Sequence, residues 1–131
     1  AITVTSVNGP ASTFIDGNQA GSVVVFKTGE GPGSILEGFT VTNGSGTLNP
    51  AGNTTGCGIY CWDAAPTVIG NIISGNSCPY GAGFFCNNHG TAPFPVLEDN
   101  TISGNSATGG GGILCAQSGL EIRDNIIIGN I

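Results

Sequence analysis

The sequence repeats one phrase three times, as NIISGNS at 71–77, NTISGNS at 100–106 and NIIIGNI at 125–131. Its first Asn recurs 29 and then 25 residues later, and its second Asn keeps the same two intervals. A repeat of this length usually corresponds to one structural unit that stacks on the next. The phrase therefore determines the fold class before any other feature is considered.

A second phrase runs in step with the first and marks the same units. It reads GIYC at 58–61, GFFC at 83–86 and GILC at 112–115. An earlier and looser copy of the first phrase is GFTVTNG at 38–44, and TVTSVNG at 3–9 resembles that copy. We therefore expect the units to extend along the whole chain, as one domain of residues 1–131.

Each unit contains short runs of alternating apolar and small polar residues between Gly and Asn. The alternation predicts strands, and the Gly and Asn positions predict tight turns. A helix is disfavoured because each of the 24 Gly residues would cost it about 1 kcal/mol. The units predict an all-β fold: a right-handed parallel β-helix (β-solenoid) of about five coils, with three short strands per coil.

Stacked coils place equivalent residues above one another, about 4.8 Å apart. Successive side chains of a strand point to opposite faces, so every second residue is expected to point inward. The predicted inward rows are Val68/Leu97/Ile122, Val41/Ile73/Ile102/Ile127, Ile59/Phe84/Ile113 and Cys61/Cys86/Cys115. The predicted outward rows are Thr40/Ile72/Thr101/Ile126, Thr42/Ser74/Ser103/Ile128 and Tyr60/Phe85/Leu114. Trp62 lies beside the last of these rows, which is a candidate lateral contact with another subunit.

The two Asn residues of the repeated phrase predict ladders inside the turns. Side-chain amides can hydrogen-bond from coil to coil in stacked strand systems, and Asn tolerates the left-handed conformation of tight turns. The predicted ladders are Asn71/Asn100/Asn125 and Asn76/Asn105/Asn130.

The pattern P-x-x-x-x-N-x-I-x-G-N, followed by G-G-G-I, resembles the right-handed parallel β-helix repeats of the pectate-lyase-like superfamily. The resemblance covers residues 34–131 well and residues 1–33 loosely. It implies the repeat region of a bacterial or archaeal surface protein. It leaves the activity open, since that superfamily includes lyases, hydrolases, adhesins and inert stalks.

Composition narrows the choice of partners. With 39% apolar and 8% charged residues, the chain should fold with a surface of Ser, Thr, Asn and Gly. Lys27 and Arg123 are its two basic residues and the net charge is −6, so nucleic acids, anionic membranes and polyanionic sugars are disfavoured. No apolar run approaches the roughly 20 residues of a membrane span.

The five Cys residues and the sparse charge predict a secreted or extracellular location, in an oxidising setting. The chain starts at Ala1, which is consistent with removal of an N-terminal signal or flanking domain. Asn43 and Asn53 begin two triplets, Asn-Gly-Ser and Asn-Thr-Thr, that match the glycan acceptor pattern.

The cysteines allow several arrangements. Cys57 and Cys61 lie in one extended run, roughly 13 Å apart, so they cannot pair with each other. We predict the disulfides Cys57–Cys78 and Cys61–Cys86, which leave Cys115 unpaired or available to another subunit. The alternative is a buried, reduced Cys stack that packs like small hydrophobic residues. A zinc site of Cys57, Cys61 and His89 is a weaker alternative.

The acidic residues suggest little chemistry. Asp99 and Asp124 share a predicted column, about 5 Å apart, which would suit the carboxylate pair of a retaining glycosidase. Both precede a turn Asn, so solvated turn formers are the better interpretation. Glu98 is expected to pair with Arg123 on the next coil, and His89 is expected in a surface loop. We predict no catalytic residue, metal or cofactor.

The outward-facing Thr and Ser residues suggest ice binding as a further alternative function. Such a site would require the hydroxyl and methyl groups of one flat face to be coplanar. The residues concerned are Thr3, Thr5, Thr40, Thr42 and Thr101. Ordinary β-propensity on a solvated face also explains them.

Neither end of the sequence shows a helical or charged cap. The chain begins with the strand-like AITVTSV and stops at IIIGNI, although a solenoid must cover its terminal strand edges and core. Either the chain is a piece of a longer solenoid, or the first coil of one subunit covers the last coil of another. The second arrangement does not close and gives a fibre.

The sequence therefore predicts a non-catalytic, extracellular structural β-solenoid, a subunit of a surface filament or stalk that assembles head to tail with copies of itself. A polysaccharide-binding or polysaccharide-cleaving module is the first alternative, with a glycan as partner. An ice-binding β-solenoid is the second.

Overall fold

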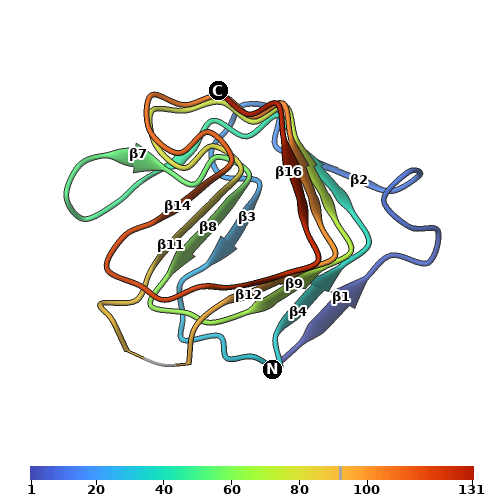
Figure 1. Cartoon of the computed structure of the whole chain (residues 1–131), viewed down its shortest axis with the longest axis horizontal. Helices are drawn as coiled ribbons and strands as arrows, with labels where there is room; N and C mark the ends of the chain where they lie inside the picture. The colour runs from blue at the N-terminus through green and yellow to red at the C-terminus, as the bar shows by residue number, and fades with distance from the viewer. Residues whose placement is uncertain (92) are drawn as a thin grey trace.

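The computed structural model is an all-β parallel solenoid, as predicted from the repeats (Figure 1). It describes residues 1–91 and 93–131, and no helix occurs in these ranges. The strands are two to four residues long, and all of them except the two strands of a short antiparallel hairpin lie in three parallel sheets that run along the solenoid.

Each sheet collects one strand from successive turns. Sheet A contains β1 (Thr3–Thr5), β4 (Ile35–Glu37), β9 (Thr67–Ile69), β12 (Val96–Glu98) and β15 (Glu121–Arg123). Sheet B contains β2 (Phe14–Asp16), β5 (Thr40–Thr42), β10 (Ile72–Ser74), β13 (Thr101–Ser103) and β16 (Ile126–Ile128). Sheet C contains β3 (Val24–Phe26), β8 (Ile59–Trp62), β11 (Phe84–Asn87) and β14 (Ile113–Cys115).

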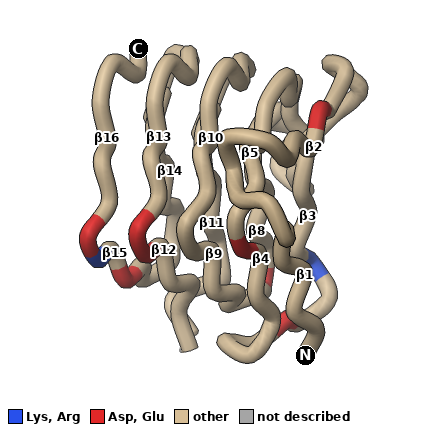
Figure 2. Tube along the Cα trace, turned by 90° about the vertical axis from the view of Figure 1, so that its right-hand side faces the viewer, with Lys and Arg blue, Asp and Glu red and all other residues tan. Residues whose placement is uncertain are grey.

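The chain visits the sheets in the order A, B, C. It completes four turns and begins a fifth, which supplies β15 and β16. In Figure 1 the chain winds counter-clockwise as it approaches the viewer, and Figure 2 places the turns in sequence order along the axis. This winding is right-handed, as predicted.

The strand register confirms the predicted inward rows. Leu97 pairs with Val68 and Ile122, Ile73 pairs with Val41 and Ile102, and Phe84 pairs with Ile59 and Ile113. The side chains of these rows meet between the three sheets and form the core. Because equivalent residues repeat from turn to turn, each turn buries its apolar side chains against its two neighbours.

The first turn differs from the prediction. Residues 3–5 (TVT) pair with Ile35–Glu37 in sheet A, whereas residues 40–42 (TVT) pair with Phe14–Asp16 in sheet B. The resemblance of residues 3–9 to residues 38–44 therefore does not mark equivalent positions. A longer connection, residues 6–13, separates β1 from β2, and the copy in phase with the repeated phrase is FIDGN at 14–18.

The first Asn ladder crosses the corner between sheets A and B. The side-chain oxygen of Asn100 accepts the backbone N–H of Asn71 at 2.9 Å, and that of Asn125 accepts the backbone N–H of Asn100 at 2.9 Å. The side-chain nitrogen of Asn100 donates back to the carbonyl of Val68 at 2.8 Å. Each buried amide thus joins two successive turns, which satisfies backbone groups that the corner would otherwise leave unpaired.

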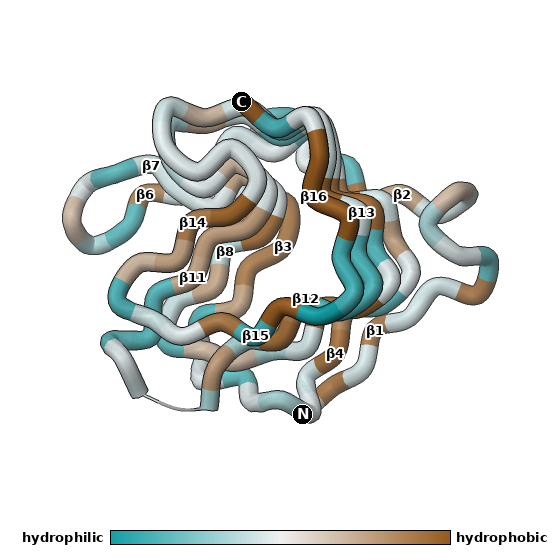
Figure 3. Tube along the Cα trace, in the orientation of Figure 1, coloured by the Kyte–Doolittle hydropathy of each residue, from teal (hydrophilic) through white to brown (hydrophobic). Residues whose placement is uncertain are grey.

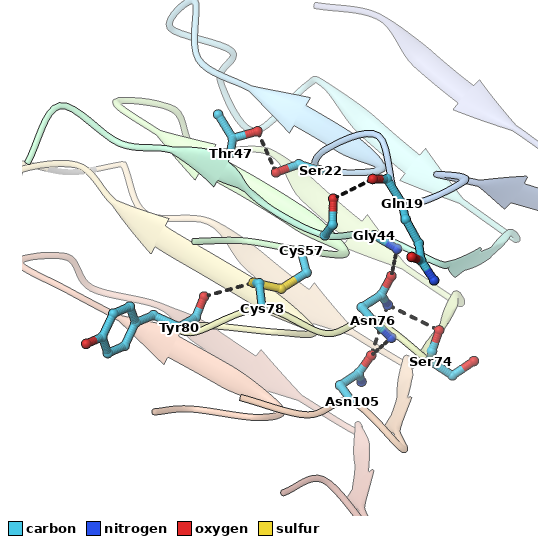
Figure 4. Close-up of a disulfide and its surroundings, with 11 residues drawn as sticks. Gln19, Ser22, Gly44, Thr47, Cys57, Ser74, Asn76, Cys78, Tyr80 and Asn105 are labelled. Carbon is cyan, nitrogen blue, oxygen red and sulfur yellow. Dashed lines mark hydrogen bonds between the residues drawn. A yellow bond between two sulfur atoms is a disulfide. The ribbon is translucent and has the colours of Figure 1, made fainter. Parts of the chain in front are cut away.

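The second Asn ladder repeats this arrangement where the chain leaves sheet B. Asn105 accepts from the backbone N–H of Asn76 at 3.1 Å, and Asn130 accepts from that of Asn105 at 3.1 Å. Asn76 in turn accepts from the backbone N–H of Gly44 at 2.9 Å (Figure 4). Both ladders have the same direction, because each side-chain oxygen faces the preceding turn.

A row of Gly residues precedes the strands of sheet C. A β-carbon on Gly58 would lie 2.5 Å from the carbonyl oxygen of Gly83, and one on Gly83 would lie 2.4 Å from that of Gly112. No other residue fits so close an approach of backbone to backbone. This spacing explains why each copy of the second phrase begins with Gly.

Two connections make the corners unequal. A hairpin of β6 (Thr47–Leu48) and β7 (Thr54–Thr55) is inserted between β5 and β8. A longer loop also joins β11 to β12. Neither changes the register of the strands that follow.

Replacing Asn100 with Ala tests the importance of the ladders. The change leaves the backbone N–H of Asn71 and the carbonyl of Val68 without their partners inside the protein, so we expect the free energy of unfolding to fall by about 3 kcal/mol. Chemical denaturation followed by circular dichroism measures this loss. Asn53→Ala, at an exposed position of the hairpin, is the control and should change stability by less than about 0.5 kcal/mol. Equal effects of the two changes would contradict a structural role for the ladder.

Candidate functional site

A groove of about 600 Å³ runs along the outer side of sheet C. It lies between the inserted hairpin and the loop that follows β11. The hairpin side contributes Asn49, Pro50, Ala51, Asn53 and Thr55; the strands and their turns contribute Trp62, Tyr80, Phe85, Asn87, His89, Leu114, Ala116 and Gln117.

Tyr60 and Phe85 do not form the exposed lateral contact predicted from their row. The row itself is correct, since Phe85 pairs with Tyr60 and Leu114, but Tyr60 is 3% exposed and Phe85 is 2% exposed. The chain folds back over them at Gly56 and Gly81, which have positive φ. A β-carbon on Gly56 would lie 2.8 Å from that of Tyr60, and one on Gly81 would lie 2.9 Å from that of Phe85.

Trp62 is the partly exposed member of this aromatic group. Its ring centroid lies 6.2 Å from that of Tyr60 and 6.4 Å from that of Phe85, with nearly parallel planes. The His89 ring meets it edge-on at 5.6 Å. The groove therefore presents the ring of Trp62, which is held in place by stacking against the buried rings of Tyr60 and Phe85.

Asp63 fixes the imidazole of His89. The two side chains are joined by a contact of 2.8 Å between Oδ1 of Asp63 and Nδ1 of His89, and both are about half exposed. His89 lies in a surface loop, as expected, but its link to Asp63 was missed. The signal was weak, since Asp63 and His89 belong to different turns and both adopt a positive φ that only the structure reveals.

The groove offers hydrogen bonds but little charge. The amide side chains of Asn49, Asn53, Asn87 and Gln117 line it, and neither Lys nor Arg occurs among its described lining residues. Such a surface favours a neutral, hydroxyl-rich ligand over an anion.

The acidic residues of the last two turns are turn formers and ion-pair partners. Asp99 and Asp124 both have a φ of 53°, which places them in the left-handed region. Arg123 lies 3.6 Å from Glu98, as predicted, and also contacts Glu121. These charges gather at the corner between sheets A and B (Figure 2). Within residues 1–91 and 93–131, no three His, Cys, Asp or Glu side chains are grouped to hold a metal ion.

Cys57 and Cys78 form a disulfide, as predicted (Figure 4). Their α-carbons are 5.9 Å apart, and the bond joins the second turn to the third. The geometry follows from the stacking, because Cys57 precedes β8 and Cys78 occupies the turn directly above it.

The predicted disulfide Cys61–Cys86 is wrong, since both are free thiols, as is Cys115. The thiol of Cys61 donates instead to the carbonyl of Ala64 at 3.1 Å, and that of Cys86 faces Cys115 with the sulfurs 3.1 Å apart. Burial raises the pKa of Cys61 to about 12, and burial also raises the pKa of Cys86. Both buried sulfurs therefore stay protonated and pack as small hydrophobic groups.

The ice-binding array is also wrong in its geometry. Thr3 and Thr5 lie in sheet A, whereas Thr40, Thr42 and Thr101 lie in sheet B. Thr40 is buried, and its hydroxyl donates to the carbonyl of Pro10 at 2.6 Å. These residues cannot form one flat, exposed face.

The glycan acceptors Asn43 and Asn53 are both exposed. The side chain of Asn43 donates to the Asp16 carboxylate at 3.0 Å, and Asn53 lies in the hairpin. Their glycosylation stays a prediction.

The last turn exposes side chains that every inner turn buries. Ile127 is 47% exposed whereas its neighbour Ile102 is fully buried, and Ile122 is 51% exposed whereas Leu97 is fully buried. The first turn behaves similarly, since Val4 is exposed above a buried Leu36. Figure 3 shows the apolar stretch along β16 at the end facing the viewer. Both terminal turns therefore expose apolar side chains of the kind that usually mark a contact with another protein surface.

No protein-family model matches the chain, and neither a curated protein nor a solved structure matches it significantly. A helix long and apolar enough to span a membrane does not occur within the described residues.

Removing the Cys57–Cys78 disulfide should destabilise the solenoid. Its two cysteines are 21 residues apart in sequence, and opening a loop of that size costs about 3 kcal/mol in the free energy of unfolding. Cys78→Ser in chemical denaturation measures this loss. Reductant should lower the stability of the unmodified protein by a similar amount and leave the variant unchanged, whereas an equal response of both proteins would contradict the assignment.

Proposed function

We propose that this protein is a secreted, non-catalytic structural solenoid that assembles head to tail, with the first turn of one copy covering the last turn of another. Surface filaments or stalks are built in this way when the contact does not close on itself. The observation that carries the proposal is the exposure of Ile122 and Ile127 at positions that are otherwise core.

The apolar rows of the two ends are compatible with each other. Val4 and Ile15 continue at the first turn the same rows that Ile122 and Ile127 continue at the last turn. Stacking two copies would extend these apolar rows from one copy into the next. Complete burial of an exposed side chain of this kind contributes about 1.5–3 kcal/mol, and Ile122 and Ile127, which are about half exposed, would gain roughly half of that.

The direction of the strands favours head-to-tail over tail-to-tail contact. Within the chain, every turn pairs with the next through parallel strands, which requires that all turns point the same way. A copy docked in the opposite sense would lose this pairing. The Asn ladders would not continue across the contact, because the first turn has Thr13 and Gly21 at the ladder positions.

The proposed interface involves sheets A and B. Sheet C has four strands whereas the others have five, so a copy seated on β15 and β16 leaves the edge of β14 open. The end of the solenoid is therefore not level, because sheets A and B extend one strand further than sheet C. The open edge of β14 reduces the area of the proposed contact.

If copies assemble head to tail, the particles that they form should grow with protein concentration. A charged side chain at the last turn should abolish this growth. Ile127→Lys places an ammonium group in the proposed contact, where its burial would be costly. We expect the unmodified protein to form rows of particles in electron micrographs and to sediment faster as its concentration rises. The variant should stay monomeric.

Ile72→Lys is the matched control, because it introduces the same charge on the outer side of sheet B in a middle turn. It should assemble like the unmodified protein. A monomer at all concentrations, or equal loss of assembly in both variants, would refute the proposed contact.

Neutral glycan binding is a second candidate function, favoured by the groove beside Trp62. The Trp62 ring and the amide side chains of the groove match the apolar faces and hydroxyl groups of sugars. The two candidates are compatible, because the groove lies on the side of the solenoid and the proposed contacts lie at its ends.

Trp62→Ala should weaken binding of a neutral polysaccharide about tenfold, since one aromatic contact is worth roughly 1–1.5 kcal/mol. Affinity electrophoresis in gels containing xylan, mannan or β-glucan measures this change. Phe14→Ala removes an exposed aromatic ring from β2, outside the groove, and should bind normally. Retardation that is unchanged by Trp62→Ala would exclude the groove as the site.

A further inference from the structure

The row Cys61/Cys86/Cys115 places three thiols in adjacent strands of sheet C. Directly paired residues of neighbouring strands have α-carbons about 4.8 Å apart, which lies within the range that a disulfide spans. The sulfurs of Cys86 and Cys115 are already 3.1 Å apart. We infer that Cys86 and Cys115 are an oxidation site, at which a second disulfide joins the third turn to the fourth.

Cys115 rather than Cys61 is the partner for two reasons. The thiol of Cys86 points to the sulfur of Cys115 and not to that of Cys61, although the thiols of Cys61 and Cys115 both also donate to the carbonyl three residues further on. Accessibility gives the second reason, since Cys61 and Cys86 are fully buried and Cys115 is exposed at the edge of β14. An oxidant in solution therefore reaches the row through Cys115.

A small-molecule disulfide is the oxidant class that fits this geometry. The Cys115 thiolate attacks one sulfur of the reagent, which forms a mixed disulfide and releases one small thiol. The sulfur of Cys86 then loses its proton and attacks the sulfur of Cys115, which releases the second small thiol. Two protein thiols are thus oxidised to one disulfide, while one reagent disulfide is reduced to two thiols.

Burial of Cys86 makes its attack on the mixed disulfide the slow step of the oxidation. Its raised pKa leaves little thiolate at neutral pH, so the second attack should accelerate as the pH rises. The mixed disulfide at Cys115 should accordingly accumulate first and then disappear.

The new bond would complete a series of covalent links between turns. Cys57–Cys78 already joins the second turn to the third, and Cys86–Cys115 would fix the third turn to the fourth. This inference does not depend on head-to-tail assembly, because β14 stays an open edge in the proposed stacking.

Treatment of the folded protein with oxidised glutathione, followed by alkylation and a Glu-specific protease, tests the inference. Cleavage after Glu37, Glu98 and Glu121 separates residues 38–98 from residues 99–121. Mass spectrometry should find these two fragments linked, with a single alkylated Cys. Opposite results are a persistent glutathione adduct on Cys115, or a link between two copies of residues 99–121; either would overturn the inference.

Two variants identify the bond and its effect. Cys61→Ala should leave the link intact, because Cys61 takes no part, and loss of the link in this variant would overturn the assignment to Cys86. Cys115→Ser changes an exposed position and should abolish the link without unfolding the protein. After oxidation, the melting temperature of the unmodified protein should rise by about 10 °C, whereas that of Cys115→Ser should not move.

Discussion

The structure depends on the pairing of each turn with the next through parallel strands and through the buried amides at the corners. Asn100 and Asn105 connect the backbones of three consecutive turns, and the apolar rows between the sheets follow the same vertical alignment. A buried amide with all its partners is favourable, but one with a missing partner is costly. The ladders therefore fix the register as well as the stability. In such a one-dimensional stack, each turn is only as stable as its contacts with its neighbours.

Much of this architecture could be predicted because the relevant signal is periodic. The phrase NIISGNS and its copies set the register of sheets A and B, and parity then assigned inward residues such as Leu97 and Phe84 correctly. The first turn was misaligned because its two TVT-like segments look alike but are separated by connections of different length. FIDGN at 14–18 was the better guide, since it keeps the Gly-Asn pair that ends each copy.

The candidate site was harder to predict, because it depends on what covers the outer side of sheet C. Parity places Tyr60 and Phe85 outside correctly, but it says nothing about the chain that folds over them. Gly56, Gly81 and Gly110 precede the members of this row by four residues each, and that regularity in the sequence marks the positions where the chain folds back. The Cys row shows the same limit: stacking brings all three thiols into range, and the contact between the sulfurs of Cys86 and Cys115, together with the exposure of Cys115, distinguishes Cys86–Cys115 from Cys61–Cys86.

The unequal corners have a further consequence. The hairpin after β5 and the loop after β11 both border the same groove, yet the strands on either side keep their register. Length and composition at these two corners are thus uncoupled from folding, because the frame of stacked strands tolerates extra residues there. Related solenoids could therefore acquire different recognition surfaces through changes confined to these two connections, much as antibody domains vary their loops on a constant sandwich.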